Sequence, residues 1–147
     1  MIIRKSIFVF GITAVLSLTS VATAPLVFAQ APAASSVFLT DQTFFKKKYS
    51  IKGSWSLVQR GDKTFIQFSD DFKTKNGPDL KVFLSPKSSD EVSGQNALEG
   101  SVKLGVLKNK KGAQEYEIPA GVDLSSFSTV LIHCEAYSVL WGGGSIK

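Results

Sequence analysis

The chain has 147 residues, of which 44% are hydrophobic and 20% are charged, and its formal net charge is +5. This is the composition of a globular, single-domain protein, and it excludes a disordered or fibrous chain. The 17 basic residues lie in short runs between acidic ones, so we expect no nucleic-acid partner.

Residues 1–29 have the pattern of a secretory signal peptide. Arg4 and Lys5 precede an apolar stretch, residues 7–28, which ends in Val27-Phe28-Ala29. We expect cleavage after Ala29 and a secreted or periplasmic protein; an uncleaved membrane anchor is the alternative. After cleavage no apolar segment is long enough to span a membrane. The leader holds two of the 17 basic residues and none of the 12 acidic ones, so the mature net charge is +3.

The mature chain is expected to form an all-β domain. The Ala-, Pro- and Ser-rich start predicts a tether over residues 30–44, followed by the domain at residues 45–147. Short apolar or alternating runs between turn residues predict an antiparallel β-sandwich or barrel of about seven to eight strands. The predicted strands cover residues 49–58, 64–68, 80–84, 101–107, 114–118, 129–134 and 137–141, with a helical turn at 122–127 and a loosened, glycine-rich C-terminus at 142–144.

The chain has a single cysteine, Cys134, which is unusual because small exported domains use cysteines in pairs. It is open to four roles: a buried inert thiol, a reactive thiol, an intermolecular bridge or a cofactor ligand. Its neighbour His133 is not a partner, since adjacent residues of a strand point to opposite faces. Cys134 shares a face with Val130 and Ile132, and this apolar setting favours simple core packing.

Other chemistry has little support in the sequence. Asp70, Asp71, Asn76 and Asp79 offer oxygen ligands for calcium, but their spacing does not match an EF-hand, and a solvated turn is the preferred interpretation. No metal site is therefore expected. No phosphate-binding loop or nucleophile elbow is present either, which favours a protein that is not an independent enzyme.

Three motifs occur in a familiar order. The first is Asn76-Gly77-Pro78-Asp79-Leu80-Lys81-Val82-Phe83-Leu84-Ser85. Residues 104–119 follow, with Gly112, Tyr116 and Pro119, and residues 128–142 contain Cys134. With these motifs the chain resembles the DM-thirteen domain family, also called the electron-transfer DM domain, from about residue 45 to residue 146.

The resemblance implies a β-rich extracytoplasmic domain with one characteristic cysteine, at the position of Cys134. Gly77, Pro78, Asp79 and Leu80 match the turn motif of the family. The role implied is electron transfer through a bare thiol or through a bound group such as haem, with Cys134 as its ligand. The family often has Trp directly before this cysteine, where this chain has His133.

Two functions follow as hypotheses. In the first, the protein is an exported redox module that acts through Cys134 with an unidentified redox partner. In the second, it is a structural or adhesive module of the cell envelope, and Cys134 only fills the core. The redox hypothesis requires that the sulfur of Cys134 open onto a cavity, whereas the structural hypothesis requires only that Cys134 be packed in the core.

Overall fold

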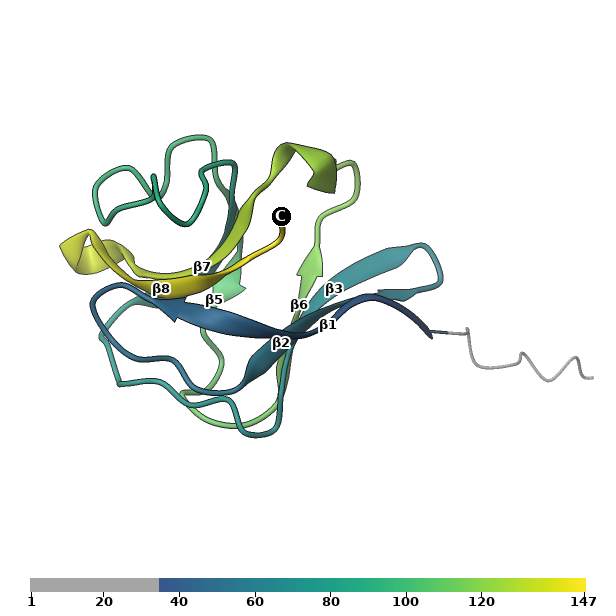
Figure 1. The fold of residues 1–147 in the computed structure, drawn as a ribbon, viewed down its shortest axis with the longest axis horizontal. Helices are drawn as coiled ribbons and strands as arrows, with labels where there is room; N and C mark the ends of the chain where they lie inside the picture. Colours follow the sequence, from purple (N-terminus) through teal and green to yellow (C-terminus); the bar gives the residue numbers. More distant parts are fainter. Residues whose placement is uncertain (1–34) are drawn as a thin grey trace, which may run out of the picture. The chain divides into compact units, whose positions relative to one another are not determined.

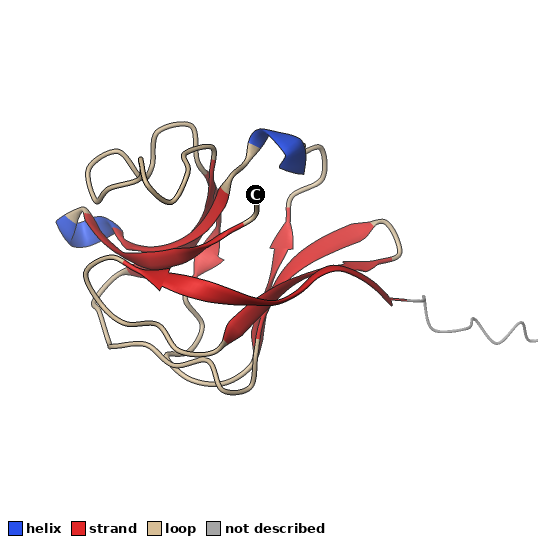
Figure 2. Cartoon of the chain, in the orientation of Figure 1, coloured by secondary structure: helices blue, strands red, loops and turns tan. Residues whose placement is uncertain are grey.

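The computed structural model describes residues 35–147, so the predicted signal peptide and residues 30–34 lie outside the described part of the chain. The domain is almost entirely β-structure, with two short 3₁₀ turns (Figures 1 and 2). Within residues 35–147 no helix is long and apolar enough to cross a membrane. The strands are β1 (Ser35–Lys46), β2 (Ser54–Arg60), β3 (Lys63–Phe68), β4 (Leu80–Ser85), β5 (Val102–Val106), β6 (Gln114–Ile118), β7 (Thr129–Cys134) and β8 (Val139–Ser145), and the turns are η1 (Leu124–Ser126) and η2 (Glu135–Tyr137).

The eight strands form one antiparallel sheet in the order β5-β4-β7-β8-β1-β2-β3-β6. The sheet curls into a nearly closed barrel, in which its two edge strands, β5 and β6, come into contact. The predicted all-β antiparallel architecture is therefore confirmed, in its barrel form.

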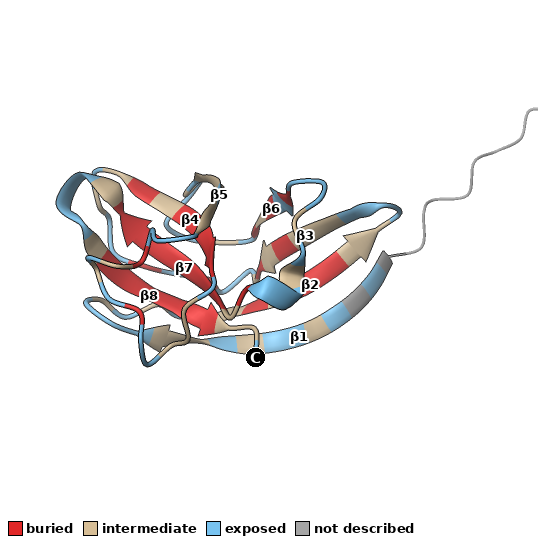
Figure 3. Ribbon diagram, turned by 90° about the horizontal axis from the view of Figure 1, so that it is seen from above, coloured by how far each residue is buried: buried red, intermediate tan, exposed pale blue. Residues whose placement is uncertain are grey.

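The central strand β7 is buried on both faces (Figure 3), as its uninterrupted apolar sequence predicts. One face belongs to the main core, where Val130, Ile132 and Cys134 pack with Trp55 and Phe68. The other face contributes to a smaller core beneath the loop that follows β4. Its members are Phe83, Val92, Ala97, Leu131 and Leu140.

The tether expected at residues 30–44 does not extend to residue 44. Residues 35–44 belong to β1, which pairs with β2 from Ser35 onward and with β8 at its end. Sequence alternation misses this strand because the pairing register shifts twice, on either side of Leu39. Asp41 lies within the second shift and has a φ of 48°, in the left-handed region, so the regular alternation of side chains along β1 is interrupted there.

The glycine run at residues 142–144 does not loosen the C-terminus, as the sequence suggested. All three glycines are buried within β8, between β7 and β1. At Gly144 a Cβ atom would lie 1.9 Å from the Nε1 atom of Trp55, so only glycine lets the strand pass this indole. The expected helical turn at residues 122–127 is confirmed as η1, and the Asp123 side chain caps it by accepting from the Ser125 N–H at 2.9 Å.

Candidate functional site

Cys134 ends β7 in the middle of the sheet and is completely buried, with an exposed fraction of 0%. It lies opposite Leu80 of β4 on one side and Val139 of β8 on the other. The backbone N–H of Glu135 donates to the carbonyl of Asp79 at 3.1 Å, which closes the β4–β7 ladder beside the thiol. The thiol is therefore held on three adjacent strands and surrounded by the main apolar core.

His133 is also completely buried, but it lies on the opposite face of β7 from Cys134. Its Nε2 atom lies 2.9 Å from the carbonyl oxygen of Gly94, and its ring packs edge-on against Phe83. Its Nδ1 atom has no hydrogen-bond partner among residues 35–147. His133 thus fastens the loop after β4 to the sheet and does not pair with Cys134.

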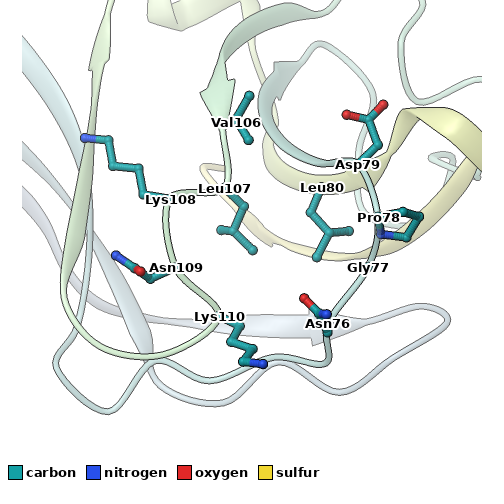
Figure 4. Close-up of a pocket in the computed structure, with 10 residues that line it drawn as sticks. All are labelled: Asn76, Gly77, Pro78, Asp79, Leu80, Val106, Leu107, Lys108, Asn109 and Lys110. Atoms are coloured by element: carbon teal, nitrogen blue, oxygen red, sulfur yellow. The ribbon is translucent and has the colours of Figure 1, made fainter.

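The turn Gly77-Pro78-Asp79-Leu80 leads into β4 and lines a pocket of about 380 Å³. Leu107 and the lysines of the β5–β6 loop form the facing wall (Figure 4). Gly77 is needed where the turn crosses Trp141, because a Cβ atom there would lie 2.9 Å from the Cζ2 atom of the indole. The pocket is lined by Asn76, Gly77, Pro78, Asp79, Leu80, Val106, Leu107, Lys108, Asn109 and Lys110.

Lys81 binds the two carboxylates next to this turn. Its Nζ atom lies 3.0 Å from Asp79 and also contacts Glu135, so it joins the residue before β4 to the start of η2, just beyond Cys134 in the chain. The hydrogen bond to Glu135, followed by the one to Asp79, raises the pKa of the Lys81 ammonium group above its ordinary value. Both carboxylates are therefore occupied by an internal cation and are poor candidates for proton transfer.

Leu80 belongs to the turn motif and is also a neighbour of the cysteine, although the two features are separate in the sequence. It lines the pocket, and it is also the residue opposite Cys134 in the β4–β7 pairing. Directly opposite residues in such a pair have Cβ atoms roughly 5 Å apart. Cys134 itself is not part of the pocket lining.

Haem does not fit Cys134 in this structure. An axial ligand must face a hollow large enough for the macrocycle, and the fully buried sulfur instead faces packed apolar side chains. A Cys134 ligand bond would need Leu80 and its neighbours to move away. Metal binding has no better support: within residues 35–147, no group of three or more His, Cys, Asp or Glu side chains is placed to hold an ion.

Sequence reasoning missed the second wall of the pocket. The sequence indicates a turn at residues 109–112, and the structure shows that the loop of residues 107–113 is held in place by Tyr116. The Tyr116 hydroxyl accepts from the Lys108 N–H at 3.0 Å and donates to Gln114 at 2.8 Å. Burial raises the pKa of Tyr116 to about 12. The inward alternation of Tyr116 within residues 114–118 was visible in the sequence, but its hydrogen bonds to a loop were not.

Comparison with known proteins gives one match. A family model described as electron transfer DM13 matches residues 43–144, well over half of the chain. The match includes the turn motif, the pocket walls and Cys134. The searches of curated proteins and of solved structures found no match. The chain therefore belongs to the electron transfer DM13 family.

Proposed function

We propose that this protein is an exported electron-transfer module whose redox group is the thiol of Cys134. The family description supports the electron-transfer role, and the predicted signal peptide supports export. The observation that carries the assignment to Cys134 is its position opposite Leu80, the residue through which the turn motif lines the pocket.

The chemistry that suits a single thiol is exchange with a disulfide of a partner. The Cys134 Sγ atom, after losing its proton to water, would bond to one sulfur of that disulfide. The second sulfur would leave with the electron pair as a thiolate, so one sulfur of the partner is reduced while Cys134 and the other sulfur are joined in a mixed disulfide. A second thiol, on the partner or on another protein, would then attack the mixed disulfide and release Cys134. This step needs direct contact with Sγ, and so the side chains over it must open.

Leu80 is the side chain we expect to open. It lines the pocket and has an exposed fraction of 5%, whereas Leu84 of the same strand does not line the pocket and lies fully buried opposite Val130. Leu80→Ala and Leu84→Ala form a matched pair, because both leucines belong to β4 and to the main core, and each substitution removes the same atoms. Only Leu80→Ala removes side-chain atoms that lie next to both the pocket and Cys134.

The test is the rate at which a small neutral disulfide reagent modifies Cys134 in the native protein. We expect slow modification of the wild type, acceleration of about tenfold or more in Leu80→Ala, and a smaller change in Leu84→Ala. Circular dichroism identifies conditions in which both variants are folded, and Leu80→Val and Leu84→Val serve if the alanine variants unfold. A thiol that stays unreactive in every folded variant would overturn the proposal.

A structural role for the domain is the second candidate, and one observation favours it. Cys134 has an exposed fraction of 0% and lies among apolar side chains, where a thiol behaves as a small hydrophobic group. In that case Cys134→Val would retain the cellular function of the protein, whereas an electron-transfer module would lose it. A visible spectrum of protein purified from haem-supplied cells tests haem separately: a Soret band that disappears in Cys134→Ser would contradict the conclusion that haem does not fit Cys134.

A further inference from the structure

Lysines from three segments far apart in the sequence gather at one end of the barrel. They come from the end of β1 and the β1–β2 loop, from the β3–β4 loop and from the β5–β6 loop, which Figure 1 shows along the lower side of the molecule. All nine side chains are exposed. This lysine face consists of Lys46, Lys47, Lys48, Lys52, Lys73, Lys75, Lys108, Lys110 and Lys111.

Backbone hydrogen bonds hold the three segments together. Lys52 and Lys73 exchange a pair of bonds, with N–H to carbonyl distances of 2.8 and 3.1 Å. Lys73 also bridges to Lys111, and the Thr74 N–H donates to the Lys110 carbonyl at 3.0 Å. The backbone of these lysines is thus held in place before any partner arrives, which lowers the entropy that ordering the loops on binding would otherwise cost.

None of these nine lysines forms an ion pair within residues 35–147, although Asp70 and Asp71 stand in the same β3–β4 loop as Lys73 and Lys75. The ion pairs within residues 35–147 use other cations, namely Arg60, Lys63, Lys81 and Lys87. The loops at the opposite ends of these strands have the reverse balance, with more acidic than basic residues. The basic residue of these loops is Lys87, and their acidic residues are Asp62, Asp90, Glu91, Glu99 and Asp123.

We propose that the lysine face is the docking surface for an acidic protein that carries an accessible disulfide, the partner of the exchange at Cys134. This inference rests on the proposed function, which requires that the partner carry a disulfide. Charge complementarity to the lysine face requires that the surface of the partner be acidic. The pocket beside Leu80 opens within this face, since Lys108 and Lys110 line it. A partner held there by its carboxylates would lie over the leucine that neighbours Cys134.

An acidic protein suits this face better than a lipid surface. Peripheral membrane binding needs exposed apolar side chains that enter the bilayer beside the basic ones. Two of the aromatic rings here are instead covered by lysines: the Lys75 ammonium lies 5.3 Å from the Tyr49 ring centroid, and the Lys47 ammonium lies 5.9 Å from the Phe45 ring centroid. The large apolar side chains exposed near this end, Val106 and Tyr137, come one each from β5 and η2 and form no continuous apolar stripe along a helix. The face is also hollowed by the pocket of about 380 Å³.

The test uses oxidised thioredoxin of an acidic type as the probe, titrated into the isotopically labelled mature protein and followed by NMR. We expect amide shifts concentrated in residues 46–52, 73–77 and 107–111. The apparent affinity should fall about tenfold or more between about 20 mM and about 200 mM NaCl, because charge pairs dominate such docking. Lysozyme, a basic protein with disulfides, should not bind.

Two double variants with equal change of charge make the test specific. Lys52→Glu/Lys110→Glu should weaken binding by about tenfold or more, whereas Lys103→Glu/Lys147→Glu, which lies outside the lysine face, should retain it. Equal loss in both variants would overturn the proposal, and so would binding to anionic phospholipid vesicles in preference to thioredoxin. Cys134→Ser should bind as the wild type does, so failure of docking and failure of the redox role give different results.

Discussion

Cys134 lies directly opposite Leu80 in the β4–β7 pairing, and Leu80 also lines the pocket formed by the Gly77–Leu80 turn. The lone thiol and the turn motif, 54 positions apart in the sequence, are therefore neighbours in the barrel. Leu80 thus neighbours both a cysteine with an exposed fraction of 0% and a surface pocket. It also leads to predictions for the residues around it.

Cys134→Ser should destabilise the domain more than Cys134→Val does. The serine hydroxyl would be buried in the main core, where apolar side chains offer it no partner, at a cost of about 1–3 kcal/mol. Valine keeps the site apolar. Urea unfolding monitored by tryptophan fluorescence measures both variants, and equal free energies of unfolding would show that the thiol site is more polar than described here.

Gly77→Ala should destabilise the domain by about 1–3 kcal/mol, because its Cβ atom would lie 2.9 Å from Trp141 and 3.0 Å from Leu80. The strain should also alter the environment of Trp141, and its fluorescence maximum reports this directly. Asn76→Ala, at the exposed neighbouring position, is the control and should leave both readouts near those of the wild type.

Lys81→Met should destabilise the protein at neutral pH, because it leaves Asp79 and Glu135 without their shared cation. The folded protein raises the pKa of Lys81, so the stabilisation is complete below the unfolded pKa of about 10.4. It is lost as the pH rises through the higher folded pKa. The difference in urea midpoint between wild type and Lys81→Met should therefore narrow at strongly alkaline pH, whereas a constant difference would contradict this assignment.

Tyr116 should ionise only at about pH 12, because its ring is desolvated beneath the β5–β6 loop. The neutral phenol stabilises the folded state, so this contribution is complete below pH about 10 and is lost as the pH rises through the folded pKa. Absorbance at 295 nm, recorded for wild type and Tyr116→Phe, isolates the titration of this residue. An ordinary pKa would show that the loop does not cover the ring.

The strands were predictable from the sequence where the pattern of apolar residues along the chain matches the faces that are buried in the structure. The apolar run of β7 and the inward Tyr116 of β6 were both recognised, because the side chains of a strand alternate between its faces. β1 was missed, since the shift at Asp41 breaks that alternation. The buried glycines of β8 were misread because their reason lies in Trp55, a residue 89 positions away from Gly144.

The candidate site was predictable only in parts. Cys134 and the Gly77–Leu80 turn were each identified through the family resemblance, and strand alternation separated His133 from the cysteine. Their juxtaposition depends on the pairing of β4 with β7, which local sequence does not encode. The clustering of lysines from separate loops is not visible in the sequence for the same reason, because only the tertiary bridges between Lys52, Lys73 and Lys111 bring these segments together.

The most direct test of the central claim is the redox state of Cys134 in cells. Cells are quenched in acid, free thiols are alkylated with one reagent, and thiols released by a reductant are alkylated with a second of different mass. An electron-transfer role through the thiol predicts that a fraction of Cys134 is reversibly oxidised and that this fraction changes when an oxidant or a reductant is added. Cys134 that remains fully reduced under every condition would contradict it.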